Sequence, residues 1–401
     1  MLVTGVLFLC ACQNNIMNDK EVIDINLTKA LNNYKDFPLS KLVKDVEILE
    51  LESNIDCYIK MPHFWYYGEK HLLVFDYRAN QLYLFDNSGK YIRKIGRPGK
   101  GPGEYTGMQL QGTMSKDEQH IIITNSSASI VIVFDLLGNV VAQKDLGEFF
   151  SAKYIQGIAC HFNGLISLLP HRPWEPSEGF SSVVLFDMEL NKVAEVLPRA
   201  NDESLVCNNI SHNSIFSDGK NSYFWEMYND TVFRYSEDGK SAPRYRFVVD
   251  KNGLTHDIMF KQKWSRNIYD YTFPWIMNFI PGYLMVNMSG NKHTVMVDLK
   301  TNEAFSIGRK TTCLLDMDQT KIWDCMENDV FGFEAPRLFM YIPDQKICVQ
   351  PFEWSRNSEM KDLDCIKNLD VTHPKVRDKL VEYCENPSED LGVVLVLMHM
   401  L

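Results

Sequence analysis

Short apolar runs that end in an aromatic residue and an aspartate recur along the chain. The clearest copies are Leu82–Asp86, Val131–Asp135 and Val183–Asp187, and each is followed by a polar turn and a second run. Looser copies occupy Val232–Lys240 and Val295–Asn302. Branched and aromatic residues favour β-strands, and an aspartate followed by glycine or asparagine is typical of a tight turn. The pattern therefore predicts β-hairpins that repeat about every fifty residues.

Each repeat has room for four strands. In the first repeat these strands are expected at His63–Lys70, His71–Arg78, Gln81–Asp86 and Tyr91–Ile95. Four-stranded units of this length are typical of β-propeller blades. Five blades are predicted, at about 61–95, 108–146, 154–197, 214–249 and 273–307, and the stretch 311–354 supplies most of a sixth.

The ends of the chain provide strands that can close such a ring. Val46–Leu51 and Val393–Leu397 are apolar runs that no internal repeat needs. Between them, Pro374 stands near the first turn of one short helix predicted over Lys375–Cys384. The fold class is therefore predicted as all-β. We expect a six-bladed β-propeller of four-stranded antiparallel blades, with one short C-terminal helix. Residues 41–401 are expected to form this single domain, closed by its N- and C-terminal strands.

An apolar run at the start of the chain ends in Leu9-Cys10-Ala11-Cys12 and is followed by polar residues. It is too short to cross a bilayer and resembles a signal peptide with a bacterial lipobox. We predict a lipoprotein signal peptide over 1–12, lipidation of Cys12, and a tether over 13–40. Two alternatives remain, because no Lys or Arg precedes the run: lipidation of Cys10, or a buried first strand.

Composition narrows the classes of partner. Hydrophobic residues make up 45% of the chain and charged residues 23%, which suits a folded domain with a sizeable core. The net charge of −11 argues against nucleic acid, because such surfaces need clustered Lys and Arg. We expect a monomer that binds no nucleic acid.

The cysteines after residue 12 contain no Cys-x-x-Cys pair, so no zinc site is expected. Most are predicted to be small buried residues. If some form disulfides, Cys313 with Cys325 and Cys365 with Cys384 are the nearest pairs in the sequence.

A glycine-rich connector follows the first blade, reading Ile95-Gly96-Arg97-Pro98-Gly99-Lys100-Gly101-Pro102-Gly103-Glu104-Tyr105. With the preceding Asp86 hairpin, it resembles the connector of the NHL-like six-bladed β-propeller lipoproteins of Gram-negative gut-type bacteria. Glu385-Asn386-Pro387 before the last strand is similar to the ending of that family. The resemblance implies a propeller anchored by lipid in the cell envelope, in the periplasm or on the outer membrane. Most members of the family carry no assigned activity.

The connector can be interpreted in two ways. Its glycines could form a loop that holds phosphate, but no Gly-Lys-Ser/Thr sequence and no apolar helix follows them. We therefore favour a rigid turn between blades, in which Gly96, Gly99, Gly101 and Gly103 supply unusual backbone angles. Pro102, Glu104 and Tyr105 complete this motif.

Strand parity indicates where a ligand would bind. In a four-stranded blade, the loop between the second and third strands lies at the same end as the connector to the next blade. We call this end the connector face, and the hairpins of the repeat lie at the other end. Polar and aromatic side chains suited to carbohydrate or peptide recognition gather in these loops. The candidate ligand-binding residues are Asp76, Arg78, Arg97, Asn125, His171, Arg172, Trp174, Glu226, Tyr228 and Asn287.

Three functions are therefore considered. The first is an extracytoplasmic binding module, lipid-anchored to the membrane, for a small molecule, glycan or protein. The second is a metal-assisted hydrolase or lyase, in which Asp76, Asn125, His171, Glu226 and Asn287 would converge on a metal. Nothing in their spacing requires a metal, so we predict no catalytic residue and no cofactor, with calcium as the candidate ion of that alternative. The third is a scaffold that docks a protein through its rim.

Overall fold

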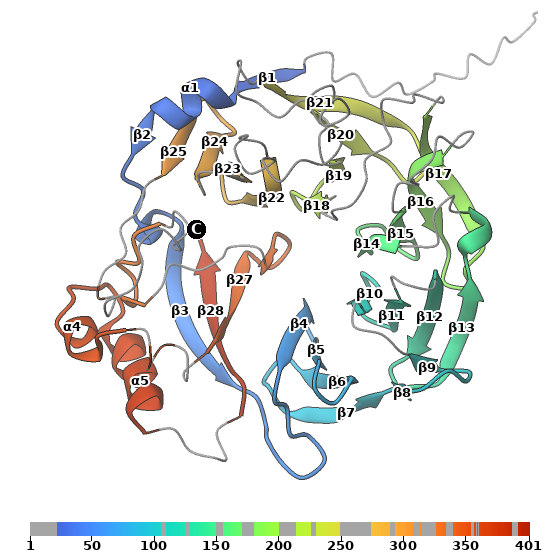
Figure 1. The fold of residues 1–401 in the computed structure, drawn as a ribbon, viewed down its shortest axis with the longest axis horizontal. Helices are drawn as coiled ribbons and strands as arrows, with labels where there is room; N and C mark the ends of the chain where they lie inside the picture. Colours follow the sequence, from blue (N-terminus) through green and yellow to red (C-terminus); the bar gives the residue numbers. More distant parts are fainter. Residues whose placement is uncertain are drawn as a thin grey trace, which may run out of the picture.

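The computed structural model of the chain describes residues 22–105, 110–125, 129–149, 155–170, 180–199, 214–225, 230–248, 274–288, 293–307, 313, 326–333, 340–353, 357, 359, 361–386 and 392–401. Six sheets, each built on four antiparallel strands, stand in a ring (Figure 1). The predicted six-bladed β-propeller is therefore confirmed.

The first three blades follow the chain from the inner strand to the outer one. Blade 1 consists of β4 (Pro62–Tyr67), β5 (His71–Asp76), β6 (Gln81–Asp86) and β7 (Tyr91–Ile95). Blade 2 consists of β10 (Leu110–Met114), β11 (His120–Asn125), β12 (Ile130–Asp135) and β13 (Val140–Asp145). Blade 3 consists of β14 (Ile155–Ala159), β15 (Ile166–Pro170), β16 (Phe180–Phe186) and β17 (Lys192–Arg199). A 3-10 turn, η2 (Gly147–Phe149), lies between blades 2 and 3.

The other three blades complete the ring. Blade 4 consists of β18 (Ser214–Ser217), β19 (Ser222–Trp225), β20 (Thr231–Tyr235) and β21 (Ser241–Val248). Blade 5 consists of β22 (Pro274–Ile280), β23 (Tyr283–Met288), β24 (Thr294–Asp298) and β25 (Ala304–Ile307). Blade 6 consists of β26 (Tyr341–Ile342), β27 (Ile347–Phe352), β28 (Val394–Met400) and β3 (Val43–Glu50).

Blade 6 joins the two ends of the chain. The N-terminal strand β3 is its outermost strand and pairs antiparallel with β28, from Val43 opposite Met400 to Glu50 opposite Val394. One further backbone bond extends the pairing, since Leu51 N donates to Val393 O at 2.9 Å. The expected closure by the two terminal strands is therefore present.

An N-terminal arm precedes β3 and wraps around blades 4 and 5 (Figure 1). It consists of β1 (Ile23–Asn26), α1 (Leu27–Asn32), β2 (Tyr34–Lys35) and the 3-10 turn η1 (Leu39–Lys41). β1 adds a fifth, parallel strand to β21, and β2 does the same for β25. The segment 13–40 was expected to be a tether, but from Ile23 onward it forms strands and a helix that pack on the propeller. The reason is apolar burial, because Ile25, Leu27 and Ala30 pack into the core of blades 4 and 5.

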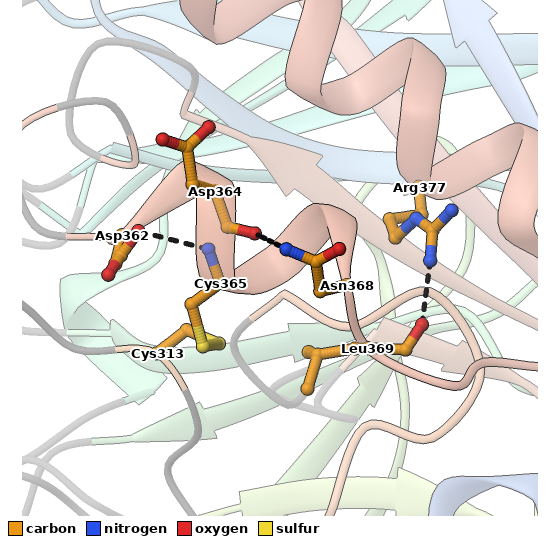
Figure 2. Close-up of a disulfide and its surroundings, with 7 residues drawn as sticks. All are labelled: Cys313, Asp362, Asp364, Cys365, Asn368, Leu369 and Arg377. Carbon is orange, nitrogen blue, oxygen red and sulfur yellow. Dashed lines mark hydrogen bonds between the residues drawn. A yellow bond between two sulfur atoms is a disulfide. The ribbon is translucent and has the colours of Figure 1, made fainter.

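Helices lie between β27 and β28 in the described part of the chain. The helix expected after Pro374 is present as α5 (Pro374–Glu385), and a shorter helix, α4 (Leu363–Lys367), precedes it. A disulfide joins Cys365 of α4 to Cys313 in the segment between blades 5 and 6 (Figure 2). This pairing replaces both disulfides considered from the sequence. No helix in the described part of the chain is long and apolar enough to cross a membrane.

The aspartates of the repeat hold the hairpins between the third and fourth strands. The carboxylate of Asp135 accepts hydrogen bonds from the backbone N and the side-chain Nδ2 of Asn139, both at 2.8 Å. Asp86 and Asp187 accept equivalent bonds within their own turns. The repeat is therefore explained by turn chemistry.

The hairpin glycines also allow neighbouring blades to approach. Gly89 has a φ of +84°, and a Cβ there would lie 2.6 Å from the carbonyl oxygen of Glu50 in blade 6. Gly239 faces Glu195 of blade 3 in the same way, at 2.5 Å. Each of these hairpins thus packs on the outer strand of the preceding blade.

Asp135→Ala should lower the free energy of unfolding by about 1–2 kcal/mol, because the turn loses its acceptor. Chemical denaturation followed by tryptophan fluorescence measures the effect. The matched control is Asp370→Ala, since Asp370 is exposed and should change stability by less than about 0.5 kcal/mol. Equal stability of the two variants would contradict this role of the hairpin.

Candidate functional site

The end of the ring opposite the connector face is crossed by the loops between first and second strands. Lys116 of blade 2 forms an ion pair of 3.9 Å with Asp344 of blade 6. A Cβ at Gly219 of blade 4 would lie 3.0 Å from Cβ of Pro343 in blade 6. Loops from blades that are not neighbours therefore touch, and this end of the ring is filled by protein.

Two titratable groups of blade 3 at this end have pKa values shifted by burial. Burial, and to a smaller extent the charge of Lys116, lower the pKa of His161 to about 4. The Nδ1 atom of His161 is buried and has no partner among the described residues. Burial likewise raises the pKa of the neighbouring Cys160 thiol. Both groups are therefore neutral and offer no charge to a ligand.

The connector from blade 1 to blade 2 is anchored by Tyr105. Its buried hydroxyl accepts from Leu82 N at 2.9 Å and donates to Ile95 O at 2.8 Å. It also contacts Nε2 of Gln81 at 3.1 Å. All these partners belong to blade 1, so Tyr105 fixes the path of the connector.

Glu104 closes the rest of the connector upon itself. Its carboxylate accepts from Gly101 N at 2.8 Å and from Nε of Arg97 at 2.7 Å. These two contacts, the Gly101 backbone first and Arg97 second, hold the pKa of Glu104 below its usual range. Gly96 and Gly103 have φ of +56° and +72°. The connector is therefore a rigid turn, and the guanidinium of the candidate ligand residue Arg97 pairs with Glu104 within it.

Asp76, a predicted ligand residue, lies at the end of β5 and is only 1% exposed. Its carboxylate accepts hydrogen bonds from three backbone N–H groups, those of Lys60 at 3.0 Å, Met61 at 3.1 Å and Arg78 at 2.9 Å. The oxygens of this buried carboxylate are therefore already used as acceptors by the backbone. Asp76 therefore positions two chain segments rather than contacting a ligand.

The two segments held by Asp76 display five side chains on the connector face of blade 1. We call them the blade-1 surface, and they are Tyr58, Lys60, Met61, Tyr77 and Arg78. Two contacts link members of this set: the Lys60 ammonium lies 5.1 Å from the centre of the Tyr58 ring, and Tyr77 N donates to Met61 O at 3.1 Å. The apolar members remain accessible, with Tyr58 52%, Met61 55% and Tyr77 38% exposed.

A column of rings supports this surface from the core. The Trp65 and Phe75 rings stack with centroids 4.7 Å apart, and Phe75 meets Tyr77 edge-on at 5.3 Å. Tyr77 in turn contacts His63, whose pKa is lowered by burial. Tyr77 is therefore held in one orientation while part of it faces solvent.

Two other predicted residues lie on blades 5 and 2. Asn287, on β23, is 8% exposed, and its Oδ1 accepts from the Thr294 hydroxyl at 2.9 Å. Asn125 ends β11 and pairs with Leu110 through the backbone register. The remaining candidates lie outside the described residues, namely His171, Arg172, Trp174, Glu226 and Tyr228.

The metal alternative gains no support from the described residues. Within them, no three His, Cys, Asp or Glu side chains are grouped to hold an ion. Asp76 is bonded to backbone and Asn287 to Thr294, as given above.

Sequence reasoning found Arg78 but missed Tyr58, Lys60 and Met61. These three lie in the connector from blade 6 to blade 1, which the sequence analysis left unassigned. The closure by the terminal strands, which the sequence does predict, implies this connector. Once Val43–Glu50 is the outer strand of blade 6, residues 51–61 must be a connector on the same face as the loop that holds Arg78.

Asp76→Ala should lower the free energy of unfolding by about 2–4 kcal/mol, because three backbone donors lose a charged, buried acceptor. Urea denaturation checks the loss, with Asp56→Ala, an exposed aspartate of the same connector, as the control. A variant with unchanged stability, or one that loses a stabilising effect of calcium seen in the parent protein, would instead favour a ligand role for Asp76.

Comparisons with known proteins agree with this fold. A structure named "Putative exported protein" from Bacteroides fragilis NCTC 9343 covers 95% of this chain and 100% of its own, with a TM-score of 0.64 and 15% identity. A member of the duf4221 family from Bacteroides vulgatus ATCC 8482 matches with a TM-score of 0.43, at 12% identity over 66% of this chain and 85% of its own. Virginiamycin B lyase from Staphylococcus aureus matches at 0.40, with 14% identity over 67% and 75%.

The last two likenesses are too distant to carry an argument about function. No curated protein matches the chain. A family model does match, over residues 22–397, which run from the N-terminal arm into β28 of blade 6. The chain therefore belongs to the family described as "Domain of unknown function (DUF4934)".

Proposed function

We propose that the chain is a lipid-anchored binding module in the envelope of a Gram-negative bacterium, outside the cytoplasm. In this proposal it is a relative of the NHL-like propeller lipoproteins, and its ligand binds on the connector face. The contact is made by the blade-1 surface, together with the loops that carry His171, Arg172, Trp174, Glu226 and Tyr228.

Three observations support a location outside the cytoplasm. The Cys313–Cys365 disulfide suits an oxidising compartment, because cytosolic thiols are kept reduced. The Bacteroides fragilis protein of similar fold carries an export name. The Leu9–Cys12 lipobox supplies the anchor, and several acyl chains would hold it firmly to a membrane.

One observation carries the proposed binding role. Asp76 uses its buried carboxylate to hold two segments, so that Tyr58, Met61 and Tyr77 stay exposed beside two cations. Exposed aromatic side chains that are rigidly held contribute much of the affinity of binding sites. The same arrangement favours binding over metal-assisted hydrolysis, since it leaves no carboxylate of Asp76 for a metal or a proton transfer.

Tyr77→Ala should weaken ligand binding by about 1–3 kcal/mol, the range expected when an exposed ring stacks on a ligand. Ligands come from a thermal-shift screen of glycans and peptides, since a ligand of the native state raises the melting temperature. Calorimetry then measures affinity. Tyr34→Ala, which removes an exposed tyrosine from the rim of blade 5, is the control. A ligand whose affinity follows Tyr34 rather than Tyr77 would move the site to the rim.

Cys12→Ser should abolish retention on membranes and leave the melting temperature unchanged, because the propeller begins beyond the proposed anchor. Fractionation of the native host with a carbonate wash measures retention. Cys10→Ser is the matched control. If the Cys12 variant still sediments with membranes and the Cys10 variant does not, the lipidated residue is Cys10.

A further inference from the structure

The two cations of the blade-1 surface have no acidic partner among the described residues. Arg78 forms no ion pair with any of them, and the Lys60 ammonium lies 5.1 Å from the centre of the Tyr58 ring. Elsewhere exposed arginines are paired, as Arg97 is with Glu104 and Arg246 with Asp24. On a chain of net charge −11, this local positive charge favours an anionic ligand.

Four backbone N–H groups beneath the surface are already bonded within the protein. The N–H groups of Lys60, Met61 and Arg78 all donate to Asp76, and Tyr77 N donates to Met61 O. An extended peptide that adds a strand needs free main-chain groups of this kind. Recognition here depends instead on ring faces and charged side chains, which disfavours an acidic peptide.

The rings suit the apolar face of a sugar. Tyr58 and Tyr77 are exposed, and the Tyr77 ring packs edge-on against Phe75. Met61 lies next to Tyr77 through their backbone bond. Aromatic faces carry negative potential and attract the C–H groups of a pyranose ring. Arg78 can pair with a carboxylate through two parallel hydrogen bonds, and Lys60 adds a point charge.

From these features we infer that the blade-1 surface binds uronate-containing oligosaccharides. Sugar rings stack on Tyr58 and Tyr77, and uronate carboxylates pair with Arg78 and Lys60. This inference rests on the proposed binding function and names its ligand class.

The test uses the full chain and three probes of matched length. Tetragalacturonate should bind, and its affinity should fall as ionic strength rises, because the charges are exposed. Its methyl ester, which keeps the rings and loses the charge, should bind at least tenfold more weakly. Tetraglutamate, which keeps the charge and loses the rings, should show no saturable binding. Calorimetry measures all three.

Matched variants assign the charge to residues. Arg78→Gln and Lys60→Gln should each weaken tetragalacturonate binding about tenfold, with unchanged melting temperatures. The control is Lys90→Gln, which removes the same charge from the hairpin at the other end of blade 1. An equal loss in the Lys90 variant would mean that general electrostatics, and not this surface, bind the probe.

The outcomes separate this inference from the proposed function. Equal binding of the methyl ester, or preference for tetraglutamate, overturns the uronate class while the binding function stands. If tetragalacturonate does not bind, but another ligand binds in a manner that depends on Tyr77, the uronate class is likewise overturned while the binding function stands. If no ligand depends on Tyr77, both the inference and the proposed site fall.

Discussion

The pairing of β3 with β28 is the contact on which the rest of the propeller depends. It joins residues at opposite ends of the chain, and without it blade 6 would expose an unpaired strand edge. Side chains reinforce it across the seam, since Tyr383 donates to Glu50 and His399 contacts Glu47 at 3.1 Å. The pairing also makes residues 51–61 the connector that carries three of the five residues of the blade-1 surface.

The sequence was sufficient to predict the ring because the decisive signals are local. An aspartate that bonds its own turn, as Asp135 does with Asn139, needs no distant partner to be recognised. The N-terminal arm was missed for the opposite reason. Ile25 is buried only because Phe247 lies opposite it, and a four-residue strand has too short a pattern to reveal that partner. The same holds for Cys313 and Cys365, which the fold brings together across 52 residues.

The site was predictable in part. Strand parity placed Arg78 on the connector face, but the direction of the Asp76 carboxylate could not be read from the sequence. An aspartate at the end of a strand can face solvent or can accept from backbone, and only the path of residues 60–61 decides between them. Likewise, the connector glycines were correctly interpreted as a turn, although the sequence did not reveal that Arg97 is tied to Glu104.

The N-terminal arm has a mechanical consequence. A pull along the chain from its N-terminal side reaches β1 before it reaches β3. β1 runs parallel to β21, and Arg246 donates two hydrogen bonds to the Asp24 carboxylate. A force along the strand axis therefore loads the hydrogen bonds between β1 and β21 together, in shear, rather than one after another. Helix α1 and strand β2 must then detach in turn before any load arrives at the closing strand. The arm thus protects the β3–β28 pairing, which closes the ring, from tension in the chain that precedes the arm.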